Sequence, residues 1–135
     1  MQDRPTSSEL LAALADFLDN EMLPHTEGPL QYRVRVASNL ATILQCEQEF
    51  GNQTLVRERT HLCRLLGISA DELAPGLLVD QVEDLNQQLV TNLEEGKFGA
   101  EFESATWQAL MAIARDKLAI VRPGYDSFDA SGERP

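Results

Sequence analysis

The stretch LVDQVEDLNQQLVTNL, residues 78–93, shows most clearly what kind of fold this chain adopts. Acidic and amide side chains fill most of the positions between its apolar residues, and Gly96 follows shortly after as a stop signal. The apolar side chains recur every three or four residues and therefore share one face of a helix: Leu78, Val82, Leu85, Leu89 and Leu93. The spacing predicts an amphipathic helix that packs through a single apolar stripe.

The same periodicity predicts four more helices, over residues 6–22, 29–50, 53–66 and 104–121. Each is followed by a residue type that ends helices, namely Pro24, Gly51, Gly67 and Pro123. We expect these helices to bury their large apolar residues, among them Leu10, Leu14 and Phe17, then Leu30, Leu40 and Leu44, and finally Trp107, Met111 and Leu118.

Two capping boxes support this reading, because Thr6 with Glu9 and Ser69 with Glu72 have the spacing in which side chains bond free amides at a helix start. The second box predicts a short helical turn before Pro75. We therefore predict an all-α fold, an antiparallel bundle of four to five helices with a short helical cross-piece near residues 70–74. Residues 1–123 are expected to form one domain, and residues 124–135 a flexible C-terminal tail.

The chain is acidic, with a net charge of −11 over 135 residues. Residues 69–103 carry nine acids and one base, including Asp80, Glu83 and Asp84. A field of this sign repels phosphate and anionic lipid, so we expect no nucleic-acid and no membrane partner. The three acids are read as an exposed helix face, with docking to a basic protein as the functional alternative.

No catalytic or cofactor motif accompanies these helices. Gly-x-Ser-x-Gly and Gly-x-x-x-x-Gly-Lys are both missing, and Glu58 and His61 form only one of the two Glu-x-x-His motifs that a di-metal bundle needs. We therefore expect no catalytic residues, no metal and no cofactor, and hence no enzyme. Cys46 and Cys63 lie on different predicted helices, which suits reduced thiols in a cytoplasm.

Two polar groups are candidate sites for a ligand or a partner. Arg35 and Asn39 are four residues apart and so are neighbours on one helix, while Asp116 and Lys117 lie near the end of the last predicted helix. One interpretation pairs Asp116 with an arginine of the 29–50 helix, fixing the register of the bundle. The other makes Arg35 and Asn39 a pocket for an anionic group, since the planar fork of arginine suits carboxylate and phosphate.

The sequence also resembles an uncharacterised family of short bacterial helical proteins. The resemblance extends over nearly the whole chain and rests on Met1 to Thr6, Arg35 to Asn39, Asp84 to Asn86 with Gly96, and Asp116 to Ala119 with Pro123 and Tyr125. Members of that family are commonly encoded beside aminoglycoside-phosphotransferase-like kinases and acyl-CoA dehydrogenases. The resemblance implies a bacterial cytoplasmic setting and a kinase-like or acyl-CoA-linked partner, and it brings no catalytic residues; Arg122 replaces the asparagine expected before the proline.

Two functions follow from these observations. We expect a non-catalytic accessory protein that docks on a phosphotransferase-like or acyl-CoA-metabolising partner through the acidic segment or an exposed apolar stripe. The alternative is a small-ligand-binding bundle, for an acyl or CoA-linked metabolite, with Arg35 as the anion anchor. Pairing of the remaining apolar surface with a second copy, a homodimer, is also open.

Overall fold

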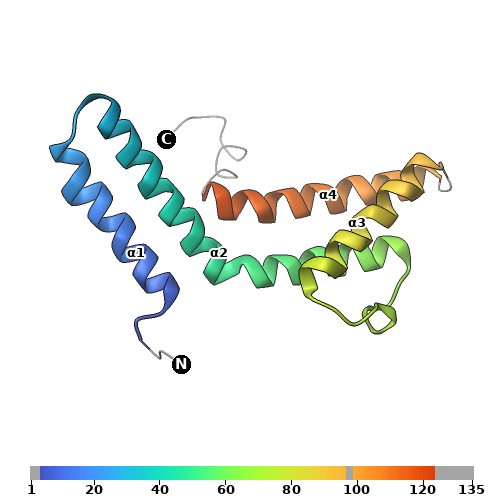
Figure 1. Cartoon of the computed structure of the whole chain (residues 1–135). Helices are drawn as coiled ribbons and strands as arrows, with labels where there is room; N and C mark the ends of the chain where they lie inside the picture. Colours follow the sequence, from blue (N-terminus) through green and yellow to red (C-terminus); the bar gives the residue numbers. More distant parts are fainter. Residues whose placement is uncertain (1–3, 97–98, 124–135) are drawn as a thin grey trace. The chain divides into compact units, whose positions relative to one another are not determined.

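The computed structural model describes residues 4–96 and 99–123, and these residues form four α-helices and no strand (Figure 1). The helices are α1 (Ser7–Phe17), α2 (Gly28–Leu66), α3 (Leu78–Glu94) and α4 (Ala100–Val121). A π-helical turn (Leu18–Met22) and a 3₁₀ turn (Leu23–His25) extend α1, and a second 3₁₀ turn (Ala70–Glu72) precedes α3. The predicted all-α fold is confirmed.

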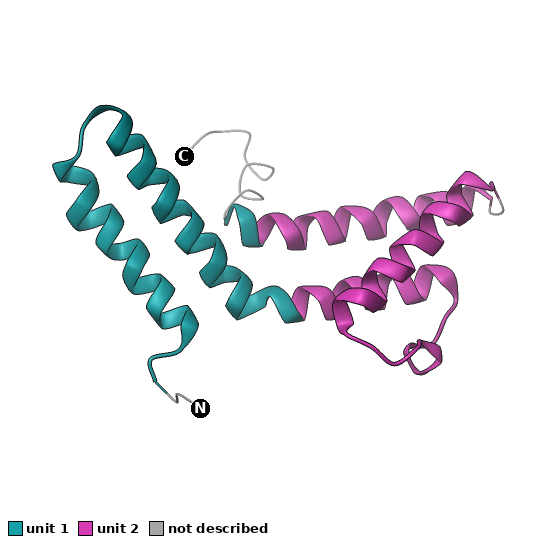
Figure 2. Cartoon of the chain, viewed as in Figure 1, with its two compact units in different colours: residues 1–52, 120–123 teal, residues 53–119, 124–135 magenta. Residues whose placement is uncertain are grey.

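The chain divides into two compact units, shown in separate colours in Figure 2. Unit 1 comprises residues 1–52 and 120–123, and unit 2 comprises residues 53–119 and 124–135. The first part of α2 therefore belongs to unit 1 and its remainder to unit 2. The tail expected at residues 124–135 lies outside the described residues, and the single-domain assignment stays a prediction.

The helix break expected at Gly51 is wrong, because α2 runs without interruption from Gly28 to Leu66. A glycine ends a helix by adopting a positive φ, and Gly51 does not adopt one. Gly67 does, with φ of 66°, and the Ile68 amide donates to the Cys63 carbonyl at 3.0 Å. This six-residue closure is the Schellman arrangement, so the predicted stop at Gly67 is confirmed.

Both capping boxes are present in the structure. The Glu9 amide donates to Thr6 Oγ1 at 3.2 Å, and the Thr6 amide donates to Glu9 Oε2 at 2.7 Å. Ser69 and Glu72 repeat the arrangement around the 3₁₀ turn, which is the predicted cross-piece. Sequence placed these starts correctly because each depends only on residues three positions apart.

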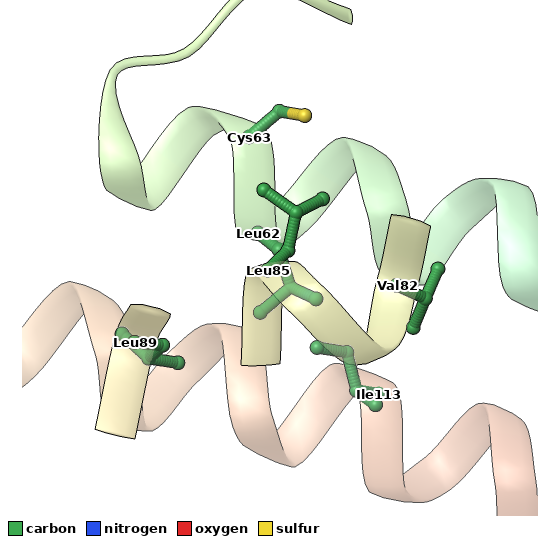
Figure 3. Packing of buried hydrophobic residues seen from close by; sticks show 6 residues of the cluster. All are labelled: Leu62, Cys63, Val82, Leu85, Leu89 and Ile113. Carbon is green, nitrogen blue, oxygen red and sulfur yellow. The ribbon is translucent and has the colours of Figure 1, made fainter. Parts of the chain in front are cut away.

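The core of unit 2 lies where α2, α3 and α4 meet (Figure 3). Leu62 of α2 and Leu85 of α3 are fully buried at its centre. The other buried members are Cys63, Val82, Leu89 and Ile113. The stripe predicted for α3 is therefore confirmed at Val82, Leu85 and Leu89.

The face predicted to be buried on α4 is wrong. The structure buries Thr106, Ala109 and Ile113, and it leaves the large apolar side chains of the neighbouring face exposed: Trp107, Leu110, Met111 and Leu118. The cause is that α4 has an apolar surface wider than its contact within unit 2. Small Ala109 allows close helix packing, which the bulkier face does not.

In unit 1, α1 and the first part of α2 lie side by side and antiparallel (Figures 1 and 2). The buried residues of these two helices are mostly small, namely Ala15, Ser38 and Ala41, together with Val34. The Ser38 hydroxyl donates to the Ala15 carbonyl at 3.5 Å. The burial predicted for the large residues is wrong, since these are exposed: Leu10, Leu14, Phe17, Leu30, Leu40 and Leu44.

Candidate functional site

The most heavily buried charged side chain of the described residues is Glu58, on the part of α2 that belongs to unit 2. Only 2% of its surface is exposed. It follows Thr54 and precedes Leu62 at four-residue spacing, so it lies on the helix face that builds the core. A buried carboxylate needs charged or hydrogen-bonding partners, and the fold must supply them.

Two other helices of unit 2 supply these partners. Lys117 Nζ of α4 donates to Glu58 Oε1 at 2.8 Å, and Asn86 Nδ2 of α3 donates to the same oxygen at 3.1 Å. Asn86 also donates to the Val82 carbonyl of its own helix, which orients its amide. Among the described residues, Glu58 Oε2 has no hydrogen-bond partner. The cluster therefore ties three helices to one carboxylate oxygen.

Further polar contacts flank this cluster. Arg57 Nε lies 3.2 Å from Asp116 Oδ2, and Arg59 donates to Gln81 Oε1 at 2.9 Å. Asp116 thus pairs with an arginine of α2, but not with one in residues 29–50 as predicted. The arginine that pairs with Asp116 is Arg57, which lies on the same continuous helix but beyond residue 50. The candidates Asp116 and Lys117 both lie in this network.

Sequence reasoning missed Glu58 and Asn86 as parts of this network. It weighed Glu58 only as half of a Glu-x-x-His metal motif, whereas the structure buries Glu58 in the core and leaves His61 half-buried. The signal was available, because Glu58 sits four residues before Leu62 on the apolar face. No cluster of three metal-ligating side chains occurs within residues 4–96 and 99–123.

The other candidate pair, Arg35 and Asn39, lies in unit 1. Both side chains line an open depression of about 340 Å³, together with Asp19 of the π-helical turn and the polar residues Ser38 and Thr42. The four-residue spacing therefore brings them to one place as predicted. The Asp19 carboxylate contributes negative charge to the same depression, which reduces its attraction for an anion.

A second depression, of about 490 Å³, lies within unit 2 between the end of α2 and the beginning of α4. His61, Arg64 and Leu65 line it from α2, and Glu101, Phe102 and Gln108 are among its residues on α4. Its charges are of both signs, so it favours no single class of ligand.

The candidates Asp80, Glu83 and Asp84 are exposed on α3, on the side away from Val82, Leu85 and Leu89. They occupy a solvated acidic face. Four of the exposed apolar residues of α4 are spaced alternately by four and three positions: Trp107, Met111, Ala114 and Leu118. This is the spacing of a helix seam that packs against another helix. We call these four residues the α4 seam.

Comparison with known protein families identifies the family of this chain. The profile of DUF6285, a domain of unknown function, matches residues 24–125. This chain belongs to the DUF6285 family. No curated protein and no solved structure matches it significantly.

The DUF6285 region contains α2, α3 and α4, and with them the Glu58 cluster, the acidic face and the α4 seam. It starts at Pro24, after α1. No described helix of this DUF6285 protein combines the length and the apolar content needed to cross a membrane. The Glu58 cluster joins α2, α3 and α4, and the acidic face and the α4 seam are exposed.

Proposed function

We propose that this DUF6285 protein is a non-catalytic accessory protein that binds another protein through unit 2. The observation that supports the proposal is the α4 seam, whose Trp107 is 67% exposed. Tryptophan is the side chain most enriched among the residues that dominate protein binding energies. An exposed tryptophan within an apolar row of heptad spacing is typical of a surface that binds another protein, whereas a helix face that stays in water is usually polar.

The negative charge on the surface of α3 indicates what kind of protein surface would bind there. Asp80, Glu83 and Asp84 are exposed, and they attract a partner whose binding surface is basic around an apolar groove. The resemblance drawn from the sequence motifs suggests a phosphotransferase-like kinase or an acyl-CoA-metabolising enzyme in a bacterial cytoplasm. Binding of one of these enzymes is the function that we propose.

The test uses purified components. Each candidate enzyme from the same genome is titrated with the full chain in a calorimeter, and the titration is repeated with Trp107→Ala and with a triple variant that reverses Asp80, Glu83 and Asp84 to lysine. We expect Trp107→Ala to weaken binding by about 30-fold, as for a hot-spot residue worth about 2 kcal/mol. The triple variant should weaken binding most at low salt.

Tyr32→Ala is the matched control, because Tyr32 is an exposed aromatic residue in unit 1. It should bind with the affinity of the wild type. Unchanged affinity in both unit 2 variants would remove these surfaces as the docking site, and absence of binding by any candidate enzyme would remove the proposed partner class.

A second function rests on the depression around Arg35 and Asn39. We propose it as a binding site for the anionic head of an acyl or CoA-linked metabolite, with Arg35 as the anchor. A panel of acyl-CoA thioesters should then raise the melting temperature of the wild type and not of Arg35→Ala. No rise across the panel would exclude this function.

A further inference from the structure

Unit 1 leaves most of its large apolar side chains without a cover. Its two helices touch through Ala15, Ser38 and Ala41, while Leu14 is 49% and Leu40 is 55% exposed. An amphipathic helix is stable only when its apolar stripe is packed against another element. The hairpin therefore has the composition of one half of a larger helical assembly.

Six of the exposed large apolar side chains of the two helices lie on one face of the hairpin. Successive residues of a helix are rotated by about 100° about its axis, and Ala15 points toward α2. Leu10, Leu14 and Phe17 are all rotated from Ala15 in the same sense, so they lie on the same side of α1. On α2, the side chains of Leu30, Leu40 and Leu44 are displaced in the same rotational sense from Val34 and Ala41. Because the helices are antiparallel, equal rotational senses bring both stripes to the same side. We call this surface the hairpin face.

We propose that the hairpin face binds the hairpin face of a second copy of this chain, forming an antiparallel four-helix bundle. This inference goes beyond the proposed function and uses the other unit. Association of two identical faces is the closed, twofold arrangement that most soluble oligomers adopt. Short antiparallel hairpins assemble in this way into four-helix bundles.

Charge decides which helix packs on which. Residues 7–22 carry four acids and no base, whereas residues 28–46 carry two arginines and no acid. Packing α1 on the partner's α1 would oppose four acids with four acids. Packing α1 on the partner's α2 opposes acids with arginines, so the twofold axis runs parallel to the helices.

The hydrogen bond between Ser38 and Ala15 shows which residues of α1 and α2 have the same position along the hairpin axis. In antiparallel helices, residues at the same axial position have a constant sum of residue numbers, here about 54. A twofold axis parallel to the helices leaves axial positions unchanged, so an α1 residue of one copy meets the α2 residue of the other copy that completes this sum. Apolar stripes and charges then match at four levels, with one residue from each copy: Leu10 and Leu44, Leu14 and Leu40, Phe17 and Ala37, and Glu21 and Arg33. The largest side chain faces the smallest, and opposite charges meet at the end of the row.

The test is sedimentation equilibrium of the full chain from micromolar to millimolar concentration. We expect the wild type to have twice the mass of the 15.0 kDa chain. Leu14→Lys and Leu40→Lys should each raise the dimer dissociation constant by about 100-fold, since each removes a buried leucine and buries a charge. Tyr32→Lys is the matched control, because Tyr32 is exposed on the same helix but outside the hairpin face.

A charge exchange tests the pairing of helices. Glu21→Lys and Arg33→Glu should each raise the dissociation constant by about tenfold, and the double variant should return it to near the wild-type value. Circular dichroism verifies that each variant is helical, as expected for side chains that are exposed in the single chain.

A monomeric wild type at every concentration overturns the proposal. So does a dimer that Leu14→Lys and Leu40→Lys leave intact, because its interface then lies elsewhere. A double charge variant that dimerises no better than the single variants overturns the packing of α1 on the partner's α2.

Discussion

At the scale of single residues, Glu58 stands out as the most heavily buried charged side chain among the described residues of unit 2. Its carboxylate is buried; among residues 4–96 and 99–123, Lys117 supplies the opposite charge and Asn86 donates a further hydrogen bond. Lys117 itself is half-exposed, with its ammonium group at the edge of the cluster. Removal of one partner from a buried ion pair costs more than removal of both, because the remaining charge stays in a medium of low polarity.

We therefore expect Lys117→Met to lower the free energy of unfolding by about 2–4 kcal/mol, because it leaves Glu58 buried without a counter-charge. The double variant Glu58→Gln with Lys117→Met should recover more than half of that loss. Urea denaturation followed by circular dichroism measures both values. A double variant less stable than Lys117→Met would show that the Glu58 charge is not what makes the single variant unstable.

Arg57→Met is the control for this experiment, since it removes the neighbouring ion pair with Asp116 in a more exposed setting. Exposed ion pairs contribute about 0–1 kcal/mol, so its effect should be small. A loss as large as that of Lys117→Met would mean that the whole polar network, and not burial of Glu58, sets the stability.

At the scale of secondary structure elements, the continuity of α2 is the main departure from the sequence prediction. Gly51 and Gly67 have the same local character in sequence, yet only Gly67 has the positive φ of a helix terminus. Local signals do not separate the two, because a glycine is tolerated inside a helix at a cost of about 1 kcal/mol when the neighbouring turns are stabilised by packing. Thr54 and Glu58 begin such packing one turn after Gly51.

This difference predicts opposite effects of the same substitution. Gly51→Ala should raise the free energy of unfolding by about 0.5–1 kcal/mol, since the added Cβ lies at an ordinary 3.5 Å from Glu47 Cγ. Gly67→Ala should lower it by about 1–2 kcal/mol, because alanine is strained at that φ. Urea denaturation of the two variants is the measurement, and destabilisation by Gly51→Ala would indicate that the helix ends near residue 51.

At the scale of the whole molecule, the two units differ in how they are stabilised. Unit 2 has a core of its own around Leu62 and Leu85, whereas unit 1 buries mostly small side chains between its two helices. If a second copy covers the hairpin face, the stability of unit 1 depends on protein concentration by mass action. The stability of unit 2 does not.

Hydrogen exchange measured by mass spectrometry at two protein concentrations distinguishes the units. Amides of residues 7–22 and 30–46 should exchange faster after dilution below the dimer dissociation constant, in proportion to the increase in the fraction of monomer. Amides of α3 should exchange at the same rate at both concentrations. Equal rates throughout the chain would contradict a concentration-dependent unit 1.

The parts that the sequence alone determined depend on neighbours within a few residues. These are the all-α class, the two capping boxes, the stop at Gly67 and the buried stripe of α3, whose apolar row is narrow and has one way to pack. The proximity of Arg35 and Asn39 follows from their four-residue spacing, whereas the depression that they line also includes Asp19 of the π-helical turn.

Only the tertiary structure decided which faces of α1, α2 and α4 are buried and which residues pair across helices. These helices have apolar surfaces too wide for periodicity to choose a direction, so close packing at Ala15, Ala41 and Ala109 made the choice. Glu58, Asn86 and Lys117 are far apart in sequence, and a buried carboxylate gains its partners only when three helices meet. The exposed seam and the hairpin face, on which the proposed partners bind, are consequences of that choice.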